Sequence, residues 1–285
     1  MTAELLWCSQ GLSFFINCGR DDWAVDHIAG RKNIGENNGK RRYPVLPEEY
    51  PPERLEELYR NLPMTGTAVK LLSRYFIAMA NLYGIIPLHK AYEIIASHNP
   101  ELVTRKEFLA YAEIARHECG EYYILGAENL LENGRESRPM EREIVDIMLI
   151  GSTVEPYRKT WRNQQGKPYY VPKKAQLLAY ENPFYCEDTP EKQRLIRFLR
   201  SQFVLSTAEA EEILIDFLFA IRSVSFRMQD AFLLLDHTGA RFHSESSIEK
   251  FAGLFSEFHN TTRMPCNRGH TPAELMSMRL GTGRL

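Results

Sequence analysis

Apolar residues recur at helical spacing along most of this chain. Between Thr65 and Leu82 they fall at Val69, Leu72, Phe76 and Met79, which is one face of an amphipathic helix. A short helix is expected to open near residue 53, and further helices are predicted over residues 87–95, 104–115, 139–150, 189–203, 206–220, 226–235 and 246–258. The pattern therefore predicts a mostly α protein.

Helix-start signals support several of these helices. Three pairs have the spacing of a capping box: Thr104 with Glu107, Ser206 with Glu209, and Thr271 with Glu274, which would open a further helix near Pro272. Ser246 or Ser247 is expected to cap the last long helix, whose apolar face begins at Ile248.

One apolar run has no helical period. Residues 121–126 read as a short strand, and we expect one or two short β-hairpins in all. The three helices before it, with a short turn between the first two, resemble a helix-turn-helix trio in which the strand would serve as a wing. Trihelical packing without a role in DNA binding is the alternative interpretation.

Changes in composition and in apolar periodicity divide the chain into four regions. Residues 1–62 form an irregular arm, whose Gly- and Asn-rich, basic part at 30–43 is expected to be an exposed loop. Residues 63–150 form a helical subdomain, 151–175 a basic aromatic linker or hairpin, and 176–285 a C-terminal helical subdomain.

Composition narrows the functional classes. The 285 residues carry a formal net charge of −2, so nucleic acid or anionic lipid could be attracted only by a local patch. The apolar stretches are too short to cross a bilayer, and the N-terminus lacks the basic lead-in of a secretory signal. Five scattered cysteines without a C-x-x-C pair indicate reduced thiols, so a cytoplasmic location without membrane contact is expected.

Catalytic and metal-binding patterns are weak. The sequence contains no G-x-S-x-G elbow and no phosphate-binding glycine loop. His117, Glu118 and Cys119 are consecutive on a predicted helix and cannot converge on one metal ion. We therefore predict no catalytic residue, no metal site and no cofactor, although a site assembled from distant residues remains an alternative.

The best candidate surface is the basic and aromatic run within 151–175. Its cations would contact phosphate, and its flat rings would stack on bases. Two arginines near the C-terminus, Arg263 and Arg268, are predicted to assist this binding; they lie in the stretch NTTRMPCNRGHTP at 260–272, which we call the C-terminal phrase. Alternatively, Arg263 with Asn267 could tie the last helices together by bonding free carbonyls. The run contributes the following candidate binding residues: Tyr157, Arg158, Lys159, Trp161, Arg162, Lys167, Tyr169, Tyr170, Lys173 and Lys174.

Three phrases carry a family resemblance. They are LYGII at 82–86, QGKPYYVP at 165–172 with LLAY at 177–180, and NTTRMPCNRGHTP at 260–272. With them, the chain resembles a family of uncharacterised proteins from Gram-positive gut bacteria and their mobile elements, over roughly residues 65–275. Some members continue into a zinc-binding tail of the SecA C-terminal type. The residues up to Leu285 contain no such tail, so the resemblance implies neither zinc binding nor a known activity here.

These features favour a non-catalytic binding or adaptor protein that docks on a nucleic acid or nucleoprotein complex. Such a protein could be encoded by a mobile element and act on a host system. The first alternative is a protein-only interaction module, or an inhibitor of an enzyme with an acidic surface. The second is an enzyme whose site the sequence does not reveal. The sequence leaves the identity of the partner and the oligomeric state open.

Overall fold

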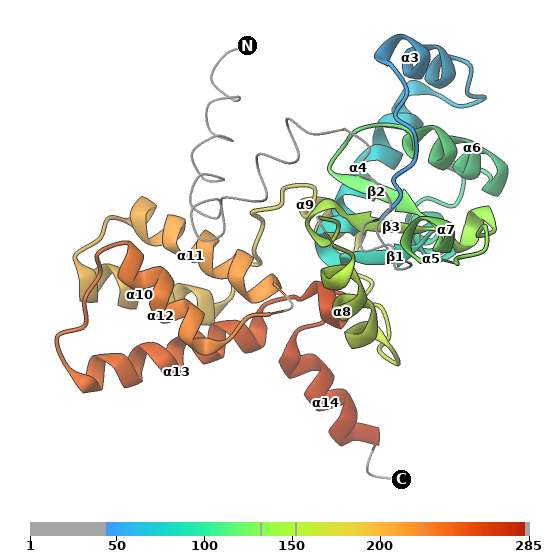
Figure 1. The fold of residues 1–285 in the computed structure, drawn as a ribbon. Helices are drawn as coiled ribbons and strands as arrows, with labels where there is room; N and C mark the ends of the chain where they lie inside the picture. Colours follow the sequence, from blue (N-terminus) through green and yellow to red (C-terminus); the bar gives the residue numbers. More distant parts are fainter. Residues whose placement is uncertain (1–43, 132, 152, 224, 283–285) are drawn as a thin grey trace, which may run out of the picture.

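Helices dominate the structure, as the sequence predicts (Figure 1). The computed structural model describes residues 44–131, 133–151, 153–223 and 225–282. The basic loop predicted at 30–43 lies outside these residues. Within them, no helix is long and apolar enough to cross a membrane. The helices are α3 (Pro52–Arg60), α4 (Gly66–Tyr83), α5 (Leu88–His98), α6 (Arg105–Ala115), α7 (Ala127–Leu130), α8 (Glu155–Gln164), α9 (Lys174–Ala179), α10 (Pro190–Phe203), α11 (Thr207–Arg222), α12 (Met228–His237), α13 (Glu245–Thr261) and α14 (Pro272–Thr282).

A small antiparallel sheet lies in the first half of the described chain. Its strands are β1 (Ile85–Pro87), β2 (Tyr122–Leu125) and β3 (Glu143–Asp146), in the order β1-β3-β2. Alternate residues point to opposite faces, and both faces are buried. On β3, Ile144 packs in the main core with residues of α4, α5 and α6. The neighbouring Val145 packs on the other face, in a small cluster with Tyr157 of α8.

Two predictions for residues 139–175 are corrected by the structure. Residues 139–150 were expected to form a helix, but they form two 3₁₀ turns, η1 (Pro139–Glu141) and η2 (Ile147–Leu149), on either side of β3. Ile144 and Val145 of β3 are buried on opposite faces of the sheet, and such a strand lacks the alternation that would distinguish it from a buried helix. Residues 151–175 were expected to be a linker or hairpin, yet α8 occupies much of this stretch.

The predicted trio of helices is present as α4, α5 and α6. The segment between the first two holds β1, which pairs with β3, and β2 pairs with the other edge of β3. Gly84 ends α4 at a φ of 67°, and a Cβ there would lie 2.9 Å from the Cβ of Pro265. Only glycine therefore fits both the conformation and the close approach of the C-terminal segment. A DNA-binding role for the trio stays a prediction.

The main core, the first of two along the chain, extends beyond residue 175, after which the sequence predicts the start of the C-terminal helical subdomain. Leu177 and Tyr180 of the α9 region are fully buried in it, and Tyr185 packs against it. The chain then crosses to the second half near Glu187. The boundary falls late because α9 packs on α4, a contact that local sequence does not reveal.

The second core is built from α10, α11, α12 and α13 and is rich in phenylalanine. Phe217, Phe251 and Phe255 are fully buried in it. The capping box of Ser206 and Glu209 forms as predicted, and so does that of Thr104 and Glu107. The cap of α13 is Ser244 rather than Ser246 or Ser247, and Ile248 is exposed instead of buried.

The C-terminal phrase returns from the second core to the first. After α13 the chain forms a 3₁₀ turn, η3 (Pro265–Asn267), which contacts both α4 and α8. Thr271 and Glu274 then cap α14 through the reciprocal backbone bonds that the sequence predicts. Figure 1 shows α14 projecting away from both halves.

Candidate partner interface

Helix α8 is fixed to the body of the protein along one side. Tyr157, Thr160 and Gln164 are buried, at the spacing of a single helical face. The Tyr157 hydroxyl donates to Glu143 over 2.6 Å, and burial raises the pKa of Tyr157, so the hydroxyl keeps its proton at neutral pH. This face anchors α8 to β3.

Gln164 holds the other end of the same face. Its Nε2 donates to the carbonyl of Tyr83 over 2.6 Å and to that of Pro265 over 2.9 Å. Because Tyr83 ends α4 and Pro265 begins η3, one buried amide joins three segments that are far apart in sequence. The position and rotation of α8 are thereby set.

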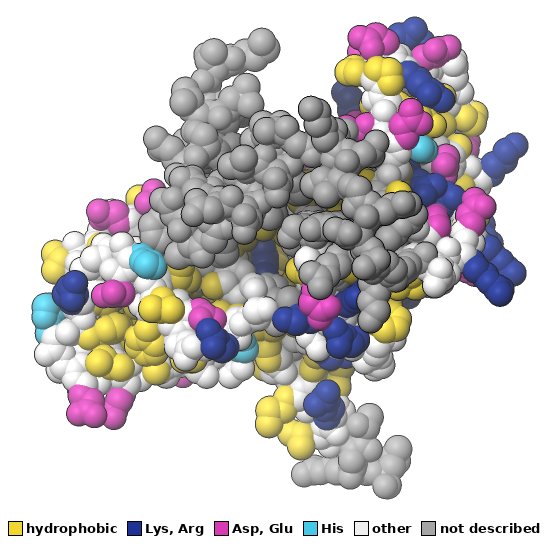
Figure 2. Space-filling view, in the orientation of Figure 1, with side chains coloured by type: hydrophobic (Ala, Val, Ile, Leu, Met, Phe, Trp, Pro, Cys, Tyr) yellow, Lys and Arg dark blue, Asp and Glu magenta, His cyan; other side chains and the backbone are white. Residues whose placement is uncertain are grey.

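The opposite side of α8 is exposed and cationic. At 100° per residue, the exposed side chains of Trp161, Arg158, Arg162 and Lys159 follow one another over about 160° of the helix circumference, outside the buried side, and we call this exposed side the α8 face. Trp161 keeps 44% of its surface exposed. Arg162 donates to Glu155 over 2.8 Å, whereas Arg158 and Lys159 form no ion pair within the described residues. In Figure 2, Lys and Arg side chains lie beside an acidic one in the region of α8.

The other half of the predicted surface is committed to internal contacts. Tyr169 lies edge-on to Tyr83 with 5.3 Å between ring centroids, and its hydroxyl donates to the Ile85 carbonyl over 3.3 Å. The guanidinium of Arg268 lies over the Tyr169 ring at 4.6 Å. The expectation that Tyr157 and Tyr169 present free flat faces is therefore corrected, because hydrophobic packing takes up their rings.

Lys167 is likewise turned inward. Its Nζ donates to the Cys266 carbonyl over 3.1 Å and to Asn267 Oδ1 over 2.7 Å, and burial lowers its pKa. Arg268 donates to the Lys167 carbonyl over 2.6 Å. These two cations connect the segment after α8 to η3, so their predicted role at an open surface gives way to a structural one.

Lys173 and Lys174 remain exposed but lie at a different place. They begin α9, and Lys174 Nζ donates to Asn99 Oδ1 over 2.5 Å, next to the end of α5. Helix α8 packs instead against β1, η2 and η3. The predicted contact set thus separates into the α8 face, a pair of lysines near α5, and an internal group.

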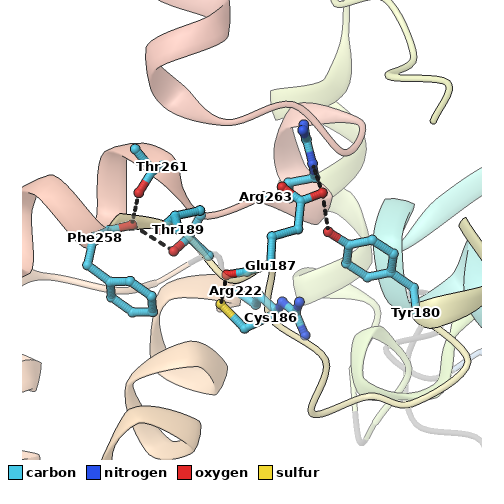
Figure 3. Close-up of a pocket in the computed structure, with 9 residues that line it drawn as sticks. Tyr180, Cys186, Glu187, Thr189, Arg222, Phe258, Thr261 and Arg263 are labelled. Atoms are coloured by element: carbon cyan, nitrogen blue, oxygen red, sulfur yellow. Dashed lines mark hydrogen bonds and ion pairs between the residues drawn. The ribbon is translucent and has the colours of Figure 1, made fainter. Parts of the chain in front are cut away.

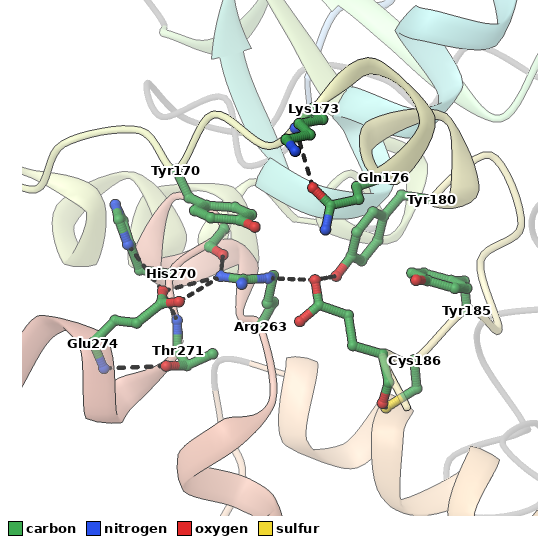
Figure 4. A network of polar contacts seen from close by, with 12 residues as sticks. Tyr170, Lys173, Gln176, Tyr180, Tyr185, Cys186, Arg263, His270, Thr271 and Glu274 are labelled. Carbon is green, nitrogen blue, oxygen red and sulfur yellow. Dashed lines mark hydrogen bonds and ion pairs between the residues drawn. The ribbon is translucent and has the colours of Figure 1, made fainter. Parts of the chain in front are cut away.

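Arg263 is the centre of the internal group (Figure 4). Its Nε donates to Glu187 over 2.8 Å, and its Nη1 donates to both carboxylate oxygens of Glu274 over 3.0 and 3.1 Å. The guanidinium also lies 3.4 Å from the centre of the Tyr170 ring and donates to the Gly269 carbonyl. The side chain is only 9% exposed. Burial by itself would lower the pKa of Arg263, but the bonds from both carboxylates raise it overall.

Arg263 therefore acts as a joint between the two halves. Glu187 comes from the crossing segment, Glu274 from the first turn of α14, and Tyr170 from the segment after α8. The alternative prediction, that Arg263 ties the last helices together by bonding a free carbonyl, agrees with its bond to the Gly269 carbonyl. The carboxylates of Glu187 and Glu274 are additional partners. Asn267 differs from that alternative, because its Nδ2 contacts Met264 Sδ and its Oδ1 accepts from Lys167.

A small recess opens beside this joint (Figure 3). Its empty space is about 250 Å³, including space open to solvent. Burial raises the pKa of the Cys186 thiol in its wall, so the reactive thiolate is disfavoured at neutral pH. Arg222, also in the wall, donates to the carbonyls of Pro183 and Tyr185 over 2.8 Å each. The recess thus consists of groups that hold the crossing segment in place.

Sequence reasoning missed several residues that the fold brings together. Glu187 gave no local signal because its cation partner, Arg263, lies 76 residues away, and Arg222 gave none because the carbonyls that it binds lie 37 and 39 residues away. A basic stripe on α10 did give one, since Arg194, Arg197 and Arg200 recur every three residues in a predicted helix. Within the described residues, no group of three His, Cys, Asp or Glu side chains could hold a metal ion. Comparisons with protein-family models, curated proteins and solved structures gave no match to this chain.

Proposed function

We propose that this protein is a non-catalytic binding protein that docks on the phosphate backbone of a nucleic acid, alone or within a nucleoprotein complex, through the α8 face. One observation carries the proposal. Two cations that form no ion pair among the described residues, and a half-exposed indole, lie on the exposed side of a helix whose other side is anchored by buried bonds.

The chemistry of the α8 face suits this partner. Arg158 and Lys159 supply charge to phosphate, and Trp161 offers a ring on which an unpaired base can stack. Because Tyr157 and Gln164 already fix the helix, binding would order side chains but not backbone. The overall charge of −2 gives no general attraction, so affinity must come from such a local surface.

The proposal can be tested by fluorescence anisotropy with single-stranded and duplex oligonucleotides at a series of salt concentrations. Reversing two charges in Arg158→Glu/Lys159→Glu should weaken binding and reduce the slope of log K against log salt by about 1.4–1.8, for two lost phosphate contacts. The matched control is Arg60→Glu/Lys70→Glu, which makes the same change of charge at two exposed positions on α3 and α4. It should leave the slope nearly unchanged.

Two results would count against the proposal. Absence of binding at low salt would remove the nucleic acid and leave an acidic protein surface as the partner, for which the same variants can be tested by pull-down. The second result is loss of binding in Arg105→Glu/Lys106→Glu, at the start of α6, with no effect of the α8 variant. That outcome would assign the contact to the helical trio instead of α8.

A further inference from the structure

The outer seam between α10 and α13 carries a glycine that the fold does not require. Gly253 lies in the middle of α13, a helix of 17 residues, and it is exposed. A Cβ at this position would meet nothing within 4 Å, and Gly253 is not among the residues with positive φ. Glycine inside a helix is destabilising relative to alanine, and neither space nor conformation within the described chain explains it.

The contacts between the two helices show what surrounds this glycine. The helices run antiparallel, because Arg194 pairs with Glu257 over 2.8 Å while Phe198 stacks near Phe251. The same register places Arg197 of α10 level with Gly253. At 100° per residue, both positions lie on the outward side of their helix, opposite its buried residues.

The charges beside Gly253 are positive and unpaired. Arg197 is exposed and forms no ion pair within the described residues. Lys250, almost one turn before Gly253, is also exposed, and its Nζ lies 5.8 Å from the Phe198 ring without a carboxylate partner among the described residues. One turn in the other direction, Glu257 is already neutralised by Arg194. The open space above Gly253, which we call the slot, thus lies level with Arg197 of α10 and almost one turn from Lys250 of α13.

We infer that this slot is a second phosphate-contact site, in which a backbone phosphate sits close to α13 above Gly253 and is held by Arg197 and Lys250. The inference rests on the proposed nucleic-acid function and extends it to the second half of the protein. The absence of a side chain at Gly253 lets the phosphate approach the helix, and the two cations supply the complementary charge. In Figure 1, α10 and α13 lie in the half of the molecule opposite the sheet, so only a long ligand would reach both this site and the α8 face.

The decisive variant is Gly253→Ala, because it should change folding and binding in opposite directions. The added methyl group raises helix propensity and meets no neighbour, so the melting temperature should rise. The same methyl group would occupy the slot, and affinity for a long oligonucleotide should fall about fivefold or more. A purely structural glycine would show no such loss of binding in a stabilised protein.

Charge variants give a second, independent measurement. Arg197→Glu and Lys250→Glu should each lower the salt slope for long oligonucleotides by about 0.7–0.9 and leave short ones unaffected. Arg241→Glu, at an exposed position with no ion pair among the described residues, serves as the matched control. Unchanged binding in Gly253→Ala and in both charge variants would overturn the inference.

The two proposals can fail separately. Loss of binding only in Arg158→Glu/Lys159→Glu would keep the α8 face and remove the seam. Loss only in the seam variants would keep the seam and remove the α8 face. Absence of binding by the unaltered protein would remove both.

Discussion

Removing the side chain of the buried Arg263 should destabilise the protein more than removing that of Arg194, which also bridges two carboxylates but is exposed. In Arg263→Ala, Glu187 and Glu274 lose their shared cation, and Tyr170 loses the guanidinium over its ring. Breaking a fully buried ion pair from one side costs about 3–5 kcal/mol.

The expected cost here is smaller because the two carboxylates are partly hydrated. The side chains of Glu187 and Glu274 are 26% and 36% exposed, and both keep other donors: the hydroxyl of Tyr180 for Glu187 and the backbone N–H of Thr271 for Glu274. We therefore expect a loss of about 2–3 kcal/mol. In a protein of this size, that lowers the melting temperature by about 4–12 °C.

Arg194→Ala is a matched control. Arg194 also bridges two carboxylates, those of Glu191 and Glu257, but its side chain is 41% exposed. Exposed pairs contribute about 0–1 kcal/mol, so this variant should melt within a few degrees of the unaltered protein. Circular dichroism during heating, with urea unfolding at 25 °C, measures both. Equal losses in the two variants would refute the burial argument. Unaltered melting of Arg263→Ala with lost binding would make Arg263 a contact residue.

Three further predictions concern the α8 anchor, the sheet and the α8 face. Gln164→Ala removes the side-chain donor to the Tyr83 carbonyl and leaves the Pro265 carbonyl with only the Arg268 backbone N–H, so it should cost about 1–3 kcal/mol in urea unfolding, whereas the exposed neighbour variant Gln165→Ala should cost less than about 1 kcal/mol. Burial raises the pKa of Asp146 to about 6, so the stability that its neutral form provides is full below about pH 4 and is lost as pH rises through 6. Asp146→Asn should therefore match the unaltered protein near pH 4 and exceed it near pH 7.5, and the opposite trend would contradict this assignment. Trp161→Ala should weaken single-strand binding by about 1–3 kcal/mol and duplex binding much less, as anisotropy would show, without changing the melting temperature.

Local signals in the sequence predicted local structure well. The capping boxes at Thr104, Ser206 and Thr271 form at the predicted residues, because a cap depends only on side chains three positions apart. The strand at 122–125 was also found. The failures at β3 and at the late domain boundary share one cause, which is that the deciding contacts come from segments distant in sequence.

The predicted contact surface illustrates the same limit for function. The sequence does not show which basic and aromatic residues within 157–174 are exposed and which are buried. In the structure, Arg158 points outward from α8, whereas Lys167 and Tyr169 make internal contacts. Helical periodicity within 155–164 could have separated the two sides of α8. Nothing local could have shown that η3, about 100 residues later, would accept the Lys167 ammonium.

The hydrogen-bond donors of the C-terminal phrase fix the two proposed contact sites relative to one another. Arg263 and its neighbours bond across the junction of the two halves, so they hold the α8 face and the α10–α13 seam in a fixed relation. A ligand that reaches both sites would then gain the second contact at a high effective concentration, but only if its own length matches the span. Affinity should accordingly rise steeply at one oligonucleotide length instead of gradually. The length at which it rises measures the distance between the two sites in solution.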